Sequence, residues 1–208
     1  VVFTPGVTGN SQDSFIDAIS IRGVRTQDFG VGGDPSAAFF KNDLYEGRNG
    51  AVVTSLYDID RAEILRGPQG FLFGRNSIGG AFSVHTKRAE VGSSNSGYVS
   101  LDVAERDHLV TEGAINIPVS DTFAMRLAGY FATEGPFAKN QFPGSSKLIE
   151  HDKYAVRWST AFEAERLALY TTVEYETREQ SGSIYRAIDE GDIWEAFDSQ
   201  LLGVELRG

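Results

Sequence analysis

The chain has 208 residues, of which 41% are hydrophobic and 23% charged, and this composition indicates a folded protein rather than a disordered one. Its net charge of −10 argues against nonspecific nucleic-acid binding, which requires a basic surface. Because the chain has no cysteine, it can form neither a disulfide scaffold nor a thiolate metal site.

Both ends of the sequence look like cuts through a longer chain. The first residues, VVFTPGVTG, lack the basic start and apolar run of a signal peptide, and no stretch reaches the roughly 18 apolar residues of a membrane helix. The last residues, LLGVELRG, have an alternating pattern that looks unfinished. We therefore expect the sequence to be a fragment of a longer protein.

The first 90 residues or so are rich in glycine and predict a small mixed α+β domain. Four short strands joined by glycine-rich turns are expected at residues 20–23, 38–45, 61–66 and 81–87. The pattern between the second and third strands is compatible with one helical turn at residues 54–60, capped by Thr54 or Ser55. Few positions would bury a wide helical face, so we expect a modest core.

From about residue 97 the pattern changes to long alternation of polar and apolar residues. In the segment FAMRLAGYF, for example, Leu127 and Phe131 fall on one face, and Arg126 and Tyr130 fall on the other. Five strands of this kind are expected at residues 97–104, 110–117, 123–131, 154–163 and 167–176. The last three match the roughly 9–11 residues with which a tilted strand crosses a bilayer.

Two architectures fit this alternation. A soluble β-sandwich alternates in the same way, and on alternation alone it is the better interpretation. Tight connections at residues 118–122 and 163–166, with a long polar one at 134–152, are instead typical of outer-membrane barrels. The polar face mixes small residues with Arg, Glu and Tyr, as a wet lumen would, which brings the two interpretations level. Aromatic residues near the strand ends add to this: Phe123, Phe131, Tyr154, Phe162 and Tyr175.

The first half of the chain decides between them. Two stretches, ISIRGV at residues 19–24 and the segment from GDPSAAFFKNDLYEG to AFSVHTKR at residues 33–88, closely resemble the plug domain of TonB-dependent outer-membrane receptors. The motif KNDLYEG is followed by DIDRAEILRGPQG and then by LFGRNSIGGAFSVHTKR, with the glycines in register. The departures are small: Lys41-Asn42 stands where the family often has Val-Asp, and Phe82 and His85 stand where it favours Ile and Val.

The resemblance implies a plug domain at residues 1–90. Over residues 91–208 it implies about the first five strands of an antiparallel transmembrane β-barrel, which the chain leaves incomplete. The implied function is uptake of a scarce nutrient, such as a ferric siderophore, across the outer membrane of a Gram-negative bacterium, with the plug gating the barrel lumen. The implied partners are TonB, through a segment expected before Val1, the outer-membrane lipid and the small-molecule nutrient itself, an iron chelate for example. No catalysis and no cofactor are implied.

Two groups of residues are expected to carry this function. In the first, glycines allow sharp turns and close approach, while charged residues, Arg88 included, pair with wall residues such as Arg126, Glu163 and Glu174. This group of plug-motif and plug–barrel contact residues comprises Arg22, Gly23, Glu63, Arg66, Gly67, Pro68, Gly70, Gly74, Arg75, Gly79, Gly80 and Lys87. The second group consists of ligand-facing candidates in the turns of the plug apex: Arg25, Gln27, Asp28, Phe29, Tyr45, Arg48 and Asn49.

Phosphate-loop and metal chemistry are disfavoured by the spacing of the residues. The stretch GPQGFLFGRNS is rich in glycine, but a Walker loop ends in Gly-Lys-Ser/Thr, and residues 74–76 here are Gly-Arg-Asn. His85, His108 and His151 lie far apart and show no ligand spacing. The sequence therefore predicts neither nucleotide binding nor a metal site.

Carboxylate pairs are the remaining hint of an enzyme. Glu163/Glu165 and Glu174/Glu176 are each two residues apart on a strand, a spacing that would suit glycoside hydrolysis. The first pair flanks a tight turn and the second continues a polar face, so both are explained without catalysis. The alternative to a receptor is therefore a soluble β-rich binding or adhesion module, which would be monomeric without detergent.

Overall fold

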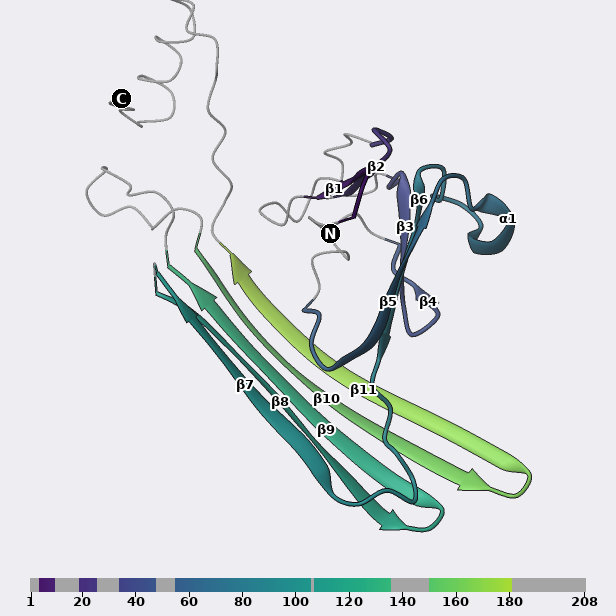
Figure 1. The fold of residues 1–208 in the computed structure, drawn as a ribbon, viewed down its shortest axis with the longest axis vertical. Coiled ribbons are helices and arrows are strands. Elements are labelled where there is room, and N and C mark those ends of the chain that lie inside the picture. Colours follow the sequence, from purple (N-terminus) through teal and green to yellow (C-terminus); the bar gives the residue numbers. More distant parts are fainter. Residues whose placement is uncertain are drawn as a thin grey trace, which may run out of the picture.

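The computed structural model describes residues 4–9, 19–25, 34–47, 55–105, 107–135 and 150–180. These residues form sheets of two, four and five strands (Figure 1). Within these ranges no helix has the length and apolar character needed to cross a membrane.

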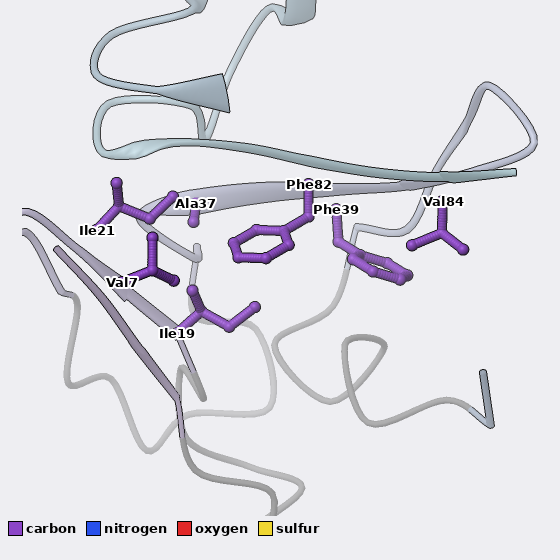
Figure 2. Packing of buried hydrophobic residues seen from close by; sticks show 7 residues of the cluster. All are labelled: Val7, Ile19, Ile21, Ala37, Phe39, Phe82 and Val84. Carbon is purple, nitrogen blue, oxygen red and sulfur yellow. The ribbon is translucent and has the colours of Figure 1, made fainter. Parts of the chain in front are cut away.

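The two smaller sheets lie in the N-terminal half and share one hydrophobic core. β1 (Val7–Gly9) pairs antiparallel with β2 (Ile19–Ile21). The four-stranded sheet has the order β4-β3-β6-β5, formed by β3 (Ala37–Lys41), β4 (Leu44–Tyr45), β5 (Ile59–Arg66) and β6 (Gly80–Thr86). Figure 2 shows the side chains that fill the space between the two sheets: Val7, Ile19, Ile21, Ala37, Phe39, Phe82 and Val84.

The N-terminal half contains more short elements than its sequence pattern predicted. The single strand expected at residues 38–45 is a hairpin, because Asn42 and Asp43 adopt φ angles of 50° and 67° and turn the chain between β3 and β4. The helical turn expected at residues 54–60 is not found in the part that the structure describes, residues 55–60, where β5 already begins at Ile59. That prediction is wrong for these residues. The one-turn helix α1 (Gly70–Phe73) and the strand β1 were not predicted.

The C-terminal half is one antiparallel sheet, called the wall below. Its strands follow one another in sequence order: β7 (Ser96–Ala104), β8 (His108–Ser120), β9 (Phe123–Glu134), β10 (His151–Ala164) and β11 (Leu167–Gln180). The sheet is open, with β7 and β11 as its edges. The last three strands have 12, 14 and 14 residues, more than the ten or so expected, because pairing continues past the alternating segments.

The two faces of the wall differ in character, as the alternation predicts. Large apolar side chains such as Leu127, Val156 and Trp158 are exposed on one face. The other face is covered by the N-terminal half (Figure 1) and carries small or charged side chains, among them Ala128 and Arg157. A sandwich would bury its apolar face under a second sheet, whereas an exposed apolar face is the surface that a bilayer covers.

Candidate functional site at the contact between the two halves

The contact between the N-terminal half and the wall is centred on Asp58. Its Oδ2 accepts a hydrogen bond from Nε of Arg126 on β9 at 2.8 Å, and its Oδ1 accepts a second one from the same guanidinium group. Nη2 of Arg157 on β10 lies 3.4 Å from Oδ2. The side chains of all three residues are 7% exposed or less. One buried carboxylate therefore joins two neighbouring strands of the wall.

Local backbone geometry presents Asp58 to the wall. The residue lies at the entry to β5 with a φ of 49°, a left-handed conformation that aspartate tolerates better than most residues. Its carbonyl oxygen accepts hydrogen bonds from the backbone N–H of Lys87, at 2.9 Å, and from Nη2 of Arg157, at 3.1 Å. The turn is thus fixed from the end of β6 and from the wall at once.

The charge of Asp58 is set by its two arginine partners. Burial alone would raise the pKa of this carboxyl, but the hydrogen bonds and charge of Arg126, followed by those of Arg157, outweigh burial and hold the pKa below its ordinary value. The group is therefore ionised at neutral pH. Because two buried guanidinium groups depend on it, losing this one charge should disturb the contact strongly.

This lowered pKa gives the contact a defined dependence on pH. The pKa of Asp58 is lower in the folded protein than in the unfolded chain. Its stabilisation is therefore fully present when the pH is above the unfolded pKa, and it is lost as the pH falls through the folded pKa. We expect the N-terminal half of the complete protein to resist pepsin near about pH 4 and to become accessible below that. Limited digestion at a series of pH values, normalised to an unfolded substrate, measures this. An Asp58→Asn variant with the same profile would contradict the assignment.

Tyr57 fills the space above the small residues of the wall. Its ring stacks on Tyr130 with 5.5 Å between centroids, and the Arg157 guanidinium lies 4.4 Å from its centre. Burial, followed by the charge of Glu174, raises the pKa of the Tyr57 hydroxyl. The ring packs against three wall residues whose small side chains allow this approach: Ala114, Ala128 and Ala155.

Two contacts with β11 flank this centre. Nζ of Lys41, at the end of β3, lies 2.8 Å from the Glu174 carboxylate. The Glu176 carboxylate accepts hydrogen bonds from the backbone N–H and the hydroxyl of Ser55, at 2.9 and 2.8 Å. Charged residues of three wall strands therefore hold the N-terminal half.

The segment between β6 and β7 is fixed to the wall by Asn116. Its side-chain oxygen accepts a hydrogen bond from the Glu90 N–H at 2.9 Å, and its amide group donates to the Glu90 carbonyl at 3.1 Å. Asn116 has 0% exposure. Beside it, Ala89 packs with Ala124 and Ala161. The side-chain amide of Asn116 therefore bonds both backbone groups of Glu90, as the backbone of a neighbouring strand does in a sheet.

Replacing Asn116 with Ala is expected to loosen this segment. The backbone N–H and carbonyl of Glu90 would both lose their hydrogen-bond partner, which costs about 1–3 kcal/mol of stability. In the complete protein, amide hydrogen exchange of residues 87–95 should accelerate by roughly tenfold or more. Asn95→Ala, at an exposed position of the same segment, is the control and should leave exchange unchanged. Equal exchange rates in the two variants would rule out this role for Asn116.

The predicted charged residues of the plug motif have other partners than the sequence suggested. Glu63 accepts a hydrogen bond from Arg61 at 2.9 Å, and Arg66 donates to the Pro5 carbonyl at 3.2 Å. The guanidinium of Arg88 lies 4.5 Å from the ring centre of Tyr170 on the wall. Lys87 lies 5.8 Å from the ring centre of Tyr98. These last two contacts with the wall are therefore made to aromatic rings.

The remaining members of the first predicted group lie at the ends of β2, β5, α1 and β6. They are Arg22, Gly23, Gly67, Pro68, Gly70, Gly74, Arg75, Gly79 and Gly80. Gly79 donates its N–H to the Ser36 carbonyl at 2.9 Å, and Gly67 donates to Gly79 at 2.9 Å. The turn after β5 is thus bonded to the turn before β6, which is bonded in turn to the loop before β3.

Only part of the second predicted group can be placed. Arg25 follows β2 and is exposed. Tyr45 ends β4, and its ring lies tilted against that of Phe40 with 5.4 Å between centroids. Its hydroxyl accepts a hydrogen bond from Asn76 at 2.7 Å. The other five candidates lie outside the described residues: Gln27, Asp28, Phe29, Arg48 and Asn49.

Sequence reasoning missed the centre of the contact. Arg126 and Glu174 were expected to face charges of the plug, and they do, but their partners Asp58 and Lys41 were not predicted. Arg157 was assigned only to the polar face. The available signal was the position of Asp58 at the start of the motif DIDRAEILRGPQG, an acidic residue just before a strand of the plug.

Comparison with known proteins supports the resemblance seen in the sequence. Residues 1–81 match the family described as TonB-dependent Receptor Plug Domain. Over 113 residues, or 54% of this chain, the sequence is 29% identical to a pesticin receptor of Yersinia enterocolitica and covers 16% of that protein.

Solved structures resemble both halves of the chain. The ferric yersiniabactin uptake receptor FyuA from Yersinia pestis matches with a TM-score of 0.75 at 20% identity, over 85% of this chain and 28% of FyuA. The pyoverdine outer membrane receptor FpvA from Pseudomonas aeruginosa PAO1 matches with a TM-score of 0.61 at 18% identity, over 86% of this chain and 25% of FpvA. The chain therefore spans less than a third of the length of these proteins and shares their fold.

Proposed function

Because this chain belongs to the TonB-dependent receptors of the Gram-negative outer membrane, we propose that the protein takes up a scarce nutrient through a lumen gated by its plug. The fold class expected from the sequence, an α+β plug followed by strands of an incomplete barrel, is confirmed by the likeness of both halves to such receptors. Members of the family are transporters rather than enzymes. The solved receptors named above are described as taking up yersiniabactin or binding pyoverdine, which supports a ferric siderophore as the nutrient.

The contact of Asp58 with Arg126 and Arg157 is the observation that carries this proposal. A gate must hold its position in the lumen and still be able to leave it, and hydrogen-bonded charges can be exchanged for water or for other charges. The hydrophobic core of the N-terminal half stays within that half, so movement against the wall need not expose it. We propose that the TonB complex supplies the force, through a segment that precedes the plug.

We also propose that the plug domain covers residues 1–90 and the barrel strands lie within residues 91–208. The last plug strand, β6, ends at Thr86 and the first wall strand begins at Ser96. The connecting segment is held at Glu90 by Asn116. The roles of the predicted plug residues and of the apex candidates remain proposals, and substitution of each by alanine in the complete protein tests them through uptake.

The proposed function is tested by uptake in cells. The complete gene is expressed in strains with and without TonB that lack their own siderophore receptors, and uptake of radiolabelled ferric siderophores, cobalamin and oligosaccharides is measured. We expect uptake of one class, and only in the strain with TonB. If no compound is taken up in a TonB-dependent way while the protein is present in the outer membrane, the proposal fails.

A further inference from the structure

The helix α1 presents large apolar side chains that nothing in the described part of the chain covers. Phe71 is 99% exposed, and Leu72 on the same helix is 71% exposed. Ile78, on the turn between α1 and β6, is also 71% exposed. Single exposed apolar residues are common, but a group of large ones on one short turn indicates a contact surface.

The turn that carries these side chains is held firmly in place. Phe73, the last residue of α1, packs edge-on against Phe40 of β3 with 5.0 Å between ring centroids. The side-chain amide of Asn76 donates hydrogen bonds to Asp34 at 2.8 Å and to the Tyr45 hydroxyl at 2.7 Å. Because the turn is ordered in advance, its exposed side chains can bind a partner with little further loss of conformational entropy.

The position of α1 indicates which partner covers it. The helix lies on the side of the N-terminal half that faces away from the wall (Figure 1). The wall is an open sheet with β7 and β11 as its edges, and a sheet in a bilayer must close into a barrel so that its edge groups are paired. The chain covers 28% of FyuA, so most strands of such a barrel lie outside it. A barrel closed around the plug places these strands opposite the wall, on the side of α1.

The two sides of the plug therefore differ in chemistry. Toward the wall, Asp58 and Lys41 make charged contacts, and charged groups can exchange their partners for water. On the opposite side, Phe71, Leu72 and Ile78 offer apolar surface. Once such a surface is buried, exposing it to water again is unfavourable and no polar partner compensates for it.

We propose that α1 packs into an apolar pocket on the barrel strands opposite the wall, and that the plug stays attached there when its wall side opens. This inference rests on the proposed gate and adds to it the side on which the gate opens. Inward positions of those strands are then expected to carry small side chains around Phe71, as Ala114, Ala128 and Ala155 of the wall do around Tyr57.

Photo-cross-linking of the complete receptor in membranes tests the position of α1. Benzoylphenylalanine in place of Phe71 should cross-link, on irradiation, to peptides that follow residue 208, which mass spectrometry identifies. The same replacement of Trp158, exposed on the outer face of β10, is the control and should give no such peptide. Cross-links of residue 71 to the wall alone, to a separate protein or to no peptide at all overturn the proposal.

Uptake by the tethered receptor tests which side moves. After cross-linking at Phe71, TonB-dependent uptake should continue, whereas a loss in proportion to the cross-linked fraction overturns the fixed role of α1. On the wall side, Ser55 and Glu176 are hydrogen-bonded at 2.8 Å. A Ser55→Cys/Glu176→Cys variant, bridged by a short reducible thiol linker, should lose uptake about tenfold or more and regain it on reduction. Unchanged uptake by the bridged variant also overturns the proposal.

The apolar nature of the contact is tested by substitution. Phe71→Ser/Leu72→Ser should make the plug at least about tenfold more accessible to trypsin, while Phe71→Leu/Leu72→Met should leave it protected. Equal accessibility of the two variants overturns the apolar contact. If residue 71 cross-links to the strands opposite the wall but no compound is taken up in a TonB-dependent way, the attachment of α1 stands and the proposed function fails.

Discussion

Replacement of Asp58 by Asn is expected to release the plug from the wall. The substitution keeps the shape of the side chain but removes its charge, so that Arg126 and Arg157 remain as buried cations without this carboxylate. Breaking a buried ion pair from one side costs about 3–5 kcal/mol. Cells that produce the complete receptor with this substitution should become sensitive to large antibiotics such as vancomycin, and the plug should become accessible to trypsin.

Asp60→Asn is the matched control, because Asp60 lies two residues further along the chain, on β5. Asp60 is exposed and pairs with Arg61 at 3.2 Å, and such surface pairs contribute about 0–1 kcal/mol. The control should therefore leave antibiotic sensitivity and trypsin protection unchanged. If the two variants behave alike, Asp58 does not hold the plug. Adding Arg126→Met and Arg157→Met to Asp58→Asn should restore part of the protection, because the buried positive charges are then gone as well.

Replacement of Gly80 by Ala is expected to have the second largest effect. A Cβ at this position would lie 2.2 Å from the carbonyl oxygen of Leu65 and 2.7 Å from Cδ1 of Ile21. The residue also has a φ of 155°, which side chains disfavour. Since the first contact is with backbone inside the β5–β6 pairing, the sheet must shift, and we expect a loss of about 3 kcal/mol or more.

Gly70→Ala is the control for this glycine. No atom lies within 4 Å of a Cβ at Gly70, and the residue begins α1, so the substitution should change stability by less than about 0.5 kcal/mol. The comparison is made by heating the two complete proteins and measuring, at each temperature, how far the plug is protected from protease. An equal midpoint for Gly80→Ala and Gly70→Ala would show that the β5–β6 pair can accommodate the added methyl group.

The inner face of the wall combines two kinds of residue with different tasks. Small side chains such as Ala128 and Ala155 let Tyr57 approach the sheet. Charged side chains between them, above all Arg157, then bind the plug through hydrogen bonds. The space comes from the small residues and the specificity from the charges, so a large side chain at Ala128 should displace Tyr57 even with every charge in place.

The sequence by itself determined the long strands of the wall and the character of their two faces. A period of two residues is a local property, because successive side chains of a strand point to opposite sides whatever the strand packs against. The alternation of Leu127 with Arg126 and Ala128 could therefore be assigned without the structure. The plug motif was equally readable, since its glycines and charges follow one another in a short stretch of sequence.

Local turns in the plug were less predictable from the pattern. The segment AFFKNDLY is apolar at both ends and was assigned to one strand, but Asn42 and Asp43 adopt positive φ angles and divide it into β3 and β4. A polar pair inside a short apolar run is compatible with a strand or with a tight hairpin turn. Pairing of β3 with β6 on its other side fixes the hairpin, and that pairing is not local.

Only the tertiary structure decided which charges meet. Asp58 and Arg126 are 68 residues apart, and Asp58 and Arg157 are 99 apart, so no spacing within the sequence relates them. Their contact depends on how one sheet docks on another, and docking is set by the shapes of two complete surfaces. The sequence shows that the polar face of the wall carries charged side chains, but each of them could pair with many oppositely charged residues of the N-terminal half. Burial of Asp58 between two arginines selects one set, because a buried charge is tolerated only with its partners in place.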